Sequence, residues 1–188
     1  MSKLKYFILF LVMWSTYFFI NYTNATRQAF NLSISLDNLI PLIPEFIFFY
    51  ILYFPLILIP FLIIKDNKNF LKIVKANIFI IVISDLFFIL LPARIIRPEL
   101  IVDNFSSYIL NLIYVLDKPV NLFPSLHVSM TFLAFLIISK FKKDLRIIIL
   151  IAFILSALST LFIKQHYLLD TLAGLVLGFI SYKIYFKK

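Results

Sequence analysis

The chain contains only two histidines, His127 and His166, and each lies where an apolar stretch begins. In KQHYLLD, residues 164–170, His166 precedes Asp170 by four positions. On a helix that spacing puts both side chains on one face, with Cβ atoms about 5–6 Å apart. A carboxylate there can hold one ring nitrogen and leave the lone pair of the other free. The pair predicts a nucleophilic or basic imidazole, and a purely structural His–Asp pair is the alternative.

The second histidine belongs to a polar island, FPSLHVSM, at residues 123–130. Proline is favoured in the first turn of a helix, so we expect a helix to begin near Pro124 with free N–H groups around Ser125 and Leu126. Such a helix end attracts anions, and a serine hydroxyl adds another ligand. The segment predicts a phosphate cradle with His127 in the same turn, although a Pro-Ser-x-His string on its own often arises by chance.

A third polar element is LPARIIRPE, residues 91–99, which holds Arg94 and Arg97. Guanidinium groups suit phosphate because they present a planar fork of donors and stay charged. Lys164 lies beside the His–Asp pair. We therefore predict Arg94, Arg97, Ser125 and Lys164 as phosphate ligands, with anchoring to lipid headgroups as the alternative for each arginine.

The composition defines what kind of molecule carries these residues. The chain has 188 residues, is 63% hydrophobic and has no cysteine, which excludes a thiolate nucleophile and a thiolate metal site. Its net charge of +9 is dispersed between apolar segments, so it does not predict a partner among nucleic acids. We expect a single domain, residues 1–188, in a lipid bilayer.

Six apolar stretches are about as long as a helix that crosses a bilayer. The predicted fold is therefore all-α, a polytopic membrane protein with six transmembrane helices in a bundle. The predicted spans are residues 6–21, 46–64, 76–92, 124–139, 147–163 and 167–184. Asp85 falls within the third span, and the sequence assigns it no chemical role.

The distribution of positive charge predicts the orientation of these spans. Of the 18 Lys and Arg residues, all but Arg27, Arg94, Arg97, Lys118 and Lys164 fall on the side of the two chain ends. The positive-inside rule then places both termini in the cytoplasm. The histidines and the predicted phosphate ligands would lie at the extracytoplasmic or luminal face.

Taken in order, these residues resemble the motifs of the type 2 phosphatidic acid phosphatase superfamily of membrane lipid phosphatases and phosphotransferases. The matching elements are Arg-Pro at 97–98, PSLH at 124–127, and Ser159 followed by His166 and Asp170. They cover roughly residues 90–170, while the six-span layout covers nearly the whole chain. Each motif is weak by itself, and the ordered set of three is specific.

Three positions depart from the family pattern. The family usually has Lys where this chain has Leu90, Gly where it has Leu126, and Arg where it has Thr160. Two cations are therefore missing from their usual places, and Arg94 and Lys164 could replace them. The altered pattern is more similar to the inositol phosphorylceramide synthase-like branch than to the simple phosphatases.

The resemblance implies a mechanism. His166 would attack phosphorus with Asp170 orienting it, and His127 would protonate the departing oxygen and then activate water or an alcohol. It implies a lipid phosphate substrate, contact with membrane lipids, and no metal or cofactor. A non-catalytic binder or transporter of phospholipid headgroups is the alternative. A haem site with two axial histidines explains neither Asp170 nor the arginines.

Overall fold

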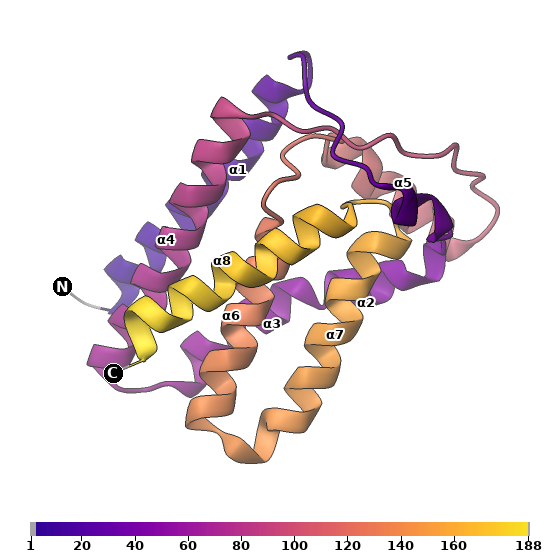
Figure 1. The fold of residues 1–188 in the computed structure, drawn as a ribbon. Coiled ribbons are helices and arrows are strands. Elements are labelled where there is room, and N and C mark those ends of the chain that lie inside the picture. Colours follow the sequence, from indigo (N-terminus) through magenta and orange to yellow (C-terminus); the bar gives the residue numbers. More distant parts are fainter. Residues whose placement is uncertain (1–2, 188) are drawn as a thin grey trace.

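The computed structural model describes residues 3–187, and among these it contains helices and no β-strand (Figure 1). The long helices are α1 (Lys3–Asn24), α4 (Asn67–Leu90), α6 (Leu126–Phe141), α7 (Arg146–Phe162) and α8 (Leu168–Phe186). The shorter α-helices are α2 (Ile47–Ile51), α3 (Tyr53–Ile63) and α5 (Phe105–Leu116). Three 3-10 turns complete the set: η1 (Ser35–Leu39), η2 (Pro44–Phe46) and η3 (Lys143–Leu145). The predicted all-α fold is confirmed.

Five stretches are long and apolar enough to cross a membrane, which fits a multi-pass membrane protein. They are Lys3–Asn24, Pro44–Ile63, Asn67–Leu90, Lys143–Phe162 and Leu168–Phe186. The remaining predicted span, 124–139, corresponds to α6, which has only 16 residues. The count of six and the cytoplasmic placement of the termini stay predictions.

Two helix boundaries differ from those expected. The third span begins at Asn67 rather than at residue 76, because Asp66 caps the helix by accepting the amide of Asn69 at 2.8 Å. The second span is divided between α2 and α3 at Leu52. Pro55 has no N–H to donate to the carbonyl of Ile51, four residues earlier, so helical hydrogen bonding is interrupted there.

Helix α6 lies at the centre of the bundle and contacts α3, α4, α7 and α8. It is buried over most of its circumference, as expected for a helix that is apolar all round. The outer helices instead expose apolar rows, including Ile147 and Ile151 on α7 and Leu172 and Val176 on α8. Such extended exposed apolar surface is what a lipid-facing bundle requires.

Two glycines, the only ones in the chain, bring α8 against α6. A Cβ added to Gly174 would lie 2.8 Å from the carbonyl oxygen of Ser125, and one added to Gly178 would lie 2.6 Å from that of Ser129. The Gly-x-x-x-Gly spacing therefore lets the two backbones approach closely. This contact sets the position of the start of α6, and hence His127, relative to α8.

The long loops lie at one end of the bundle and the chain ends at the other (Figure 1). Two isolated bridges join the loops, pairing Phe30 with Ala93 and Arg94 with Val120. Helix α5 packs in this layer, in a segment for which the sequence predicted only a loop between residues 93 and 123. The loop layer holds the residues that surround the two histidines.

Candidate active site

His166 lies in a tight turn between α7 and α8. Lys164 adopts a positive φ of 51°, and the amides of Gln165 and His166 both donate to the carbonyl of Thr160, at 2.9 and 3.0 Å. Helix α8 begins only at Leu168. The four-residue spacing suggested that His166 lies in the first turn of this helix, but His166 precedes the helix.

The structure nevertheless brings His166 and Asp170 together. Their Nδ1 and Oδ2 atoms are 3.6 Å apart, and Asp170 is fully buried. The carboxylate is held in place because Oδ2 accepts the amide of Tyr167 at 2.8 Å, capping α8. The separation exceeds the 2.7–3.2 Å usual for an N–H···O hydrogen bond.

His127, in the first turn of α6, is clamped on both faces. Its ring stacks with Tyr50 at 4.5 Å and with Tyr53 at 4.3 Å between centroids. Its Nε2 lies 2.9 Å from the hydroxyl of Ser156 on α7. The imidazole is thus held by three side chains from three other helices, α2, α3 and α7, and its Nδ1 makes none of these contacts.

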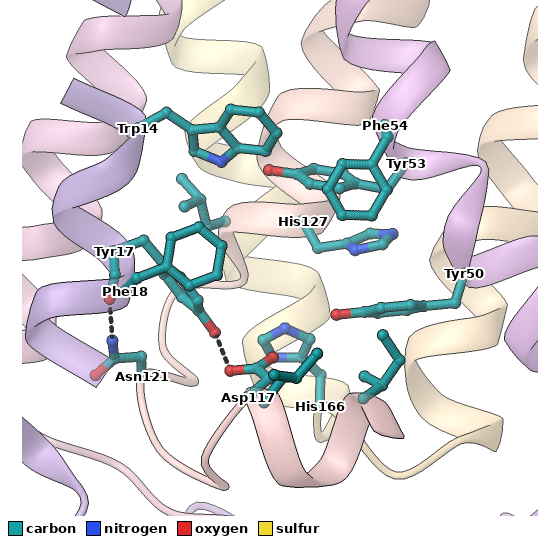
Figure 2. Close-up of a pocket in the computed structure, with 13 residues that line it drawn as sticks. Trp14, Tyr17, Phe18, Tyr50, Tyr53, Phe54, Asp117, Asn121, His127 and His166 are labelled. Atoms are coloured by element: carbon teal, nitrogen blue, oxygen red, sulfur yellow. Dashed lines mark hydrogen bonds between the residues drawn. The ribbon is translucent and has the colours of Figure 1, made fainter. Parts of the chain in front are cut away.

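Both histidines line one cavity of about 240 Å³ between α1, α2, α3 and the start of α6 (Figure 2). Its polar lining also includes Asp117 and Asn121. Six of its lining side chains are aromatic: Trp14, Tyr17, Phe18, Tyr50, Tyr53 and Phe54. The chain's two imidazoles, distant in sequence, therefore face the same space.

Ser125 has a structural role that was not predicted from the sequence. Its hydroxyl caps α6 by accepting the amide of Val128 at 3.2 Å, and its own amide donates to the backbone carbonyl of Asp170 at 3.0 Å. The helix begins at Leu126, two residues after Pro124. The amide of Ser125 is therefore occupied, which corrects the expectation of a free N–H group there.

Arg97 lies beside this site and retains donor capacity. Its guanidinium donates to the carbonyls of Tyr114 and Asp117, at 3.2 and 2.9 Å, and to the side-chain oxygen of Gln165. Arg97 Nε and Gln165 Nε2 are both buried without an acceptor among residues 3–187. Buried donors normally have partners, so these two are candidate donors to an external acceptor such as a phosphoryl oxygen, although neither side chain lines the cavity that holds the histidines.

The other two predicted cations are bound elsewhere. Arg94 donates to the carbonyl of Ala25, at 2.6 Å, just past the end of α1. Lys164 donates to the carbonyls of Asp37 and Ile40 in the loop layer. Neither side chain lines the cavity that holds the histidines. Their role as phosphate ligands stays a prediction.

Asp117, at the end of α5, is a cavity residue that the sequence did not single out. Its Oδ1 accepts the hydroxyl of Tyr17 at 2.7 Å (Figure 2). Burial raises the pKa of this carboxyl, and the Tyr17 hydrogen bond and the nearby Arg97 and His166 offset only part of that rise. Burial therefore has the largest effect on the pKa of this carboxyl.

A comparison with protein families matches residues 9–184 to the model of the PAP2 superfamily. The chain belongs to this superfamily. Its members, the type 2 phosphatidic acid phosphatases, have phosphatase-type activity on lipid phosphates, and the expected family is thereby confirmed. No curated protein and no solved structure matches the chain.

Within this PAP2 protein, the three departures from the family motifs have different surroundings. Leu126 lines the cavity, and Thr160 uses its backbone carbonyl to hold the His166 turn. Leu90 is exposed at the end of α4. None of the three supplies a cation, so the charge for an anion must come from other residues such as Arg97.

Proposed function

We propose that this protein is an integral membrane phosphatase or phosphotransferase that cleaves a lipid phosphate or pyrophosphate ester at its extracytoplasmic face. The observation that carries the proposal is that His127 and His166 line one cavity, with Asp170 beside His166. A phosphoryl group between two imidazoles can be attacked by one while the other handles the proton.

In this mechanism the free imidazole nitrogen of His166 forms a bond to phosphorus as the bond to the leaving oxygen breaks. His127 donates its proton to that oxygen, and later takes a proton from water or an alcohol that attacks the phosphohistidine. Asp170 stabilises the positive charge that develops on His166. The imidazole leaves phosphorus in the second step and is regenerated.

The phosphoryl oxygens would accept hydrogen bonds from Arg97 and Gln165. This assignment is supported by their two unpaired buried donors, Arg97 Nε and Gln165 Nε2, in a pair of side chains already hydrogen-bonded to each other. Neither side chain lines the cavity, so both must turn toward it to reach the phosphate. Fixed donors of this kind stabilise charge in the transition state. The mechanism needs no metal, so activity should survive a chelator.

The decisive experiment traps the intermediate with an activated aryl phosphate, whose leaving group needs no proton. His127→Ala should accumulate labelled phosphoenzyme that is labile to acid and stable to alkali, while His166→Ala should form none. Circular dichroism of both variants in detergent controls for folding. Equal labelling of the two variants would overturn the assignment of nucleophile, and an unlabelled, inactive parent would favour a headgroup binder or transporter.

The proposed face is testable because the chain has no cysteine of its own. Glu99→Cys places a thiol in the exposed loop beside the site, and Asp144→Cys places one in the exposed turn at the opposite end of the bundle. In intact cells an impermeant maleimide should label the first and spare the second. The reverse pattern would put the active site in the cytoplasm.

A further inference from the structure

The carboxylate of Asp117 faces the cavity without a cation of its own. Among residues 3–187 the one ion pair within 4 Å joins His166 to Asp170. Arg97 is near Asp117 but donates to its backbone carbonyl. No Lys or Arg of the described chain lines the cavity, and Asp117 is the only carboxylate that does. This part of the cavity attracts positive charge and repels a phosphate.

The surroundings of Asp117 are aromatic. Trp14 and Tyr17 come from α1, and Tyr50 and Tyr53 come from α2 and α3 (Figure 2). Aromatic side chains attract cations through their quadrupole, and clusters of them recognise quaternary ammonium groups, which are too weakly hydrated to need strong hydrogen bonds. A carboxylate among aromatic residues is suited to an ammonium ligand.

The size of the cavity also fits a headgroup. At roughly 30 Å³ per water molecule, its volume of about 240 Å³ equals that of some eight waters. That space holds a choline-sized or ethanolamine-sized group. Because both histidines line the same cavity, the phosphate of such a headgroup would lie next to them.

We propose that this cavity binds the ammonium group of a zwitterionic phospholipid headgroup, of the ethanolamine or choline type, with Asp117 as its counter-charge. The inference rests on the proposed function for the position of the phosphate. The unpaired donors of Arg97 and Gln165 take the phosphate, and Asp117 with the aromatic residues takes the ammonium. The two ends of the headgroup thus meet opposite charges.

The corresponding reaction begins on a phosphodiester. His166 forms a nitrogen–phosphorus bond while the bond from phosphorus to the diacylglycerol oxygen breaks, and His127 protonates that oxygen. The headgroup phosphate stays on His166 with its ammonium beside Asp117. Water or a hydroxyl group then attacks phosphorus, gives its proton to His127, and releases the headgroup phosphate or transfers it.

The test compares Asp117→Asn with the matched control Glu99→Gln, in the full chain purified in a maltoside detergent. Asparagine can still accept the hydroxyl of Tyr17, so only the charge is lost. The measurement is the ratio of kcat/KM for phosphatidylcholine to that for phosphatidate. The expected ratio falls about tenfold in Asp117→Asn, the worth of one desolvated cation contact, and does not change in Glu99→Gln.

Binding can be followed without turnover because the single tryptophan of the chain, Trp14, lines the cavity. Phosphocholine should change its fluorescence in saturable fashion in the His166→Ala variant, whereas glycerol 3-phosphate at the same concentrations should change it far less. Asp117→Asn should weaken the phosphocholine response about tenfold. Because this readout needs no chemistry, it tests the headgroup inference apart from the enzyme mechanism.

Two results would overturn the inference while leaving the proposed function intact: an unchanged preference in Asp117→Asn, or equal fluorescence responses to phosphocholine and glycerol 3-phosphate. An unchanged preference in Asp117→Asn, together with normal turnover of phosphatidate, would indicate a cavity for an uncharged headgroup or an acyl chain. Conversely, a specific phosphocholine response in a parent protein that turns over no lipid phosphate would support the ammonium site and refute the enzyme.

Discussion

The contact between α6 and α8 yields the sharpest structural prediction, the effect of Gly174→Ala. The added Cβ would lie 2.8 Å from the carbonyl oxygen of Ser125, whereas ordinary contacts begin at 3.4 Å, so the backbones must separate by about 0.6 Å. Ser125 caps α6 and lies two residues before His127. Asp170 lies one turn before Gly174 on α8. The clash should therefore separate His127 from His166, the proposed proton donor and the proposed nucleophile.

A misplacement of 1 Å can cost about 10²-fold in rate, so a shift of about 0.6 Å should lower kcat by roughly tenfold or more. Overpacking should also destabilise the fold by about 1–3 kcal/mol. Turnover of an aryl phosphate and thermal unfolding in detergent measure the two effects. Val176→Ala, at a lipid-facing position of the same helix, is the control. Parental kcat in a folded Gly174→Ala protein would refute the idea that this contact positions the site.

Three further substitutions test single contacts. Asp170→Asn can still cap α8 but cannot stabilise an imidazolium, so we expect kcat to fall by about 10²-fold or more with little change in melting temperature. Ser156→Ala removes the hydroxyl 2.9 Å from His127 Nε2 and should slow lipid turnover about tenfold; with an aryl phosphate, whose leaving group needs no proton, formation of the phosphoenzyme should keep the parental rate. Burial raises the pKa of Asp117, so the folded chain binds that proton more tightly than the unfolded chain and loses stability as pH rises through the raised pKa. Asp117→Asn should therefore raise the melting temperature at neutral pH, and the difference should disappear near pH ~4; a lower melting temperature at neutral pH would contradict the burial of an unpaired charge.

Local spacing was enough to identify the residues that act through neighbours in the sequence. His166 and Asp170 are four positions apart, and a turn followed by a capped helix start brings them together almost as a helix would. The apolar stretches likewise located the long helices, because burial or lipid contact determines which stretches are apolar. Such features depend on short-range geometry, which a sequence records directly.

The structure separates Arg94 and Arg97, which were both predicted as phosphate ligands. They are three positions apart, and residues 92–104 are not helical. In extended backbone, successive side chains alternate, so positions three apart point to opposite sides. Arg94 accordingly turns to the end of α1 and Arg97 to α5 and Gln165.

The clamp on His127 and the carboxylate of Asp117 could not be predicted, for a different reason. Tyr50, Tyr53 and Ser156 reach His127 from other helices, and in a chain with ten tyrosines their residue type carries no signal. Asp117 depends on α5, an apolar helix of 12 residues that is too short to be predicted as a membrane span. Contacts of this kind are created by tertiary packing alone.

Helix α5 connects the two charge environments of the site. Its last turn supplies the carbonyl of Tyr114, and Asp117 follows directly, so both accept from Arg97 where the helix dipole is negative. The same Asp117 directs its carboxylate into the cavity. One helix end therefore holds Arg97, the proposed phosphate ligand, and presents the carboxylate of Asp117 to the cavity. The guanidinium of Arg97 and the carboxylate of Asp117 are fixed to each other. A ligand with its own positive and negative ends at matching separation is therefore favoured over a simple phosphate. A simple phosphate would meet the repulsion of Asp117 without the compensation of an ammonium group.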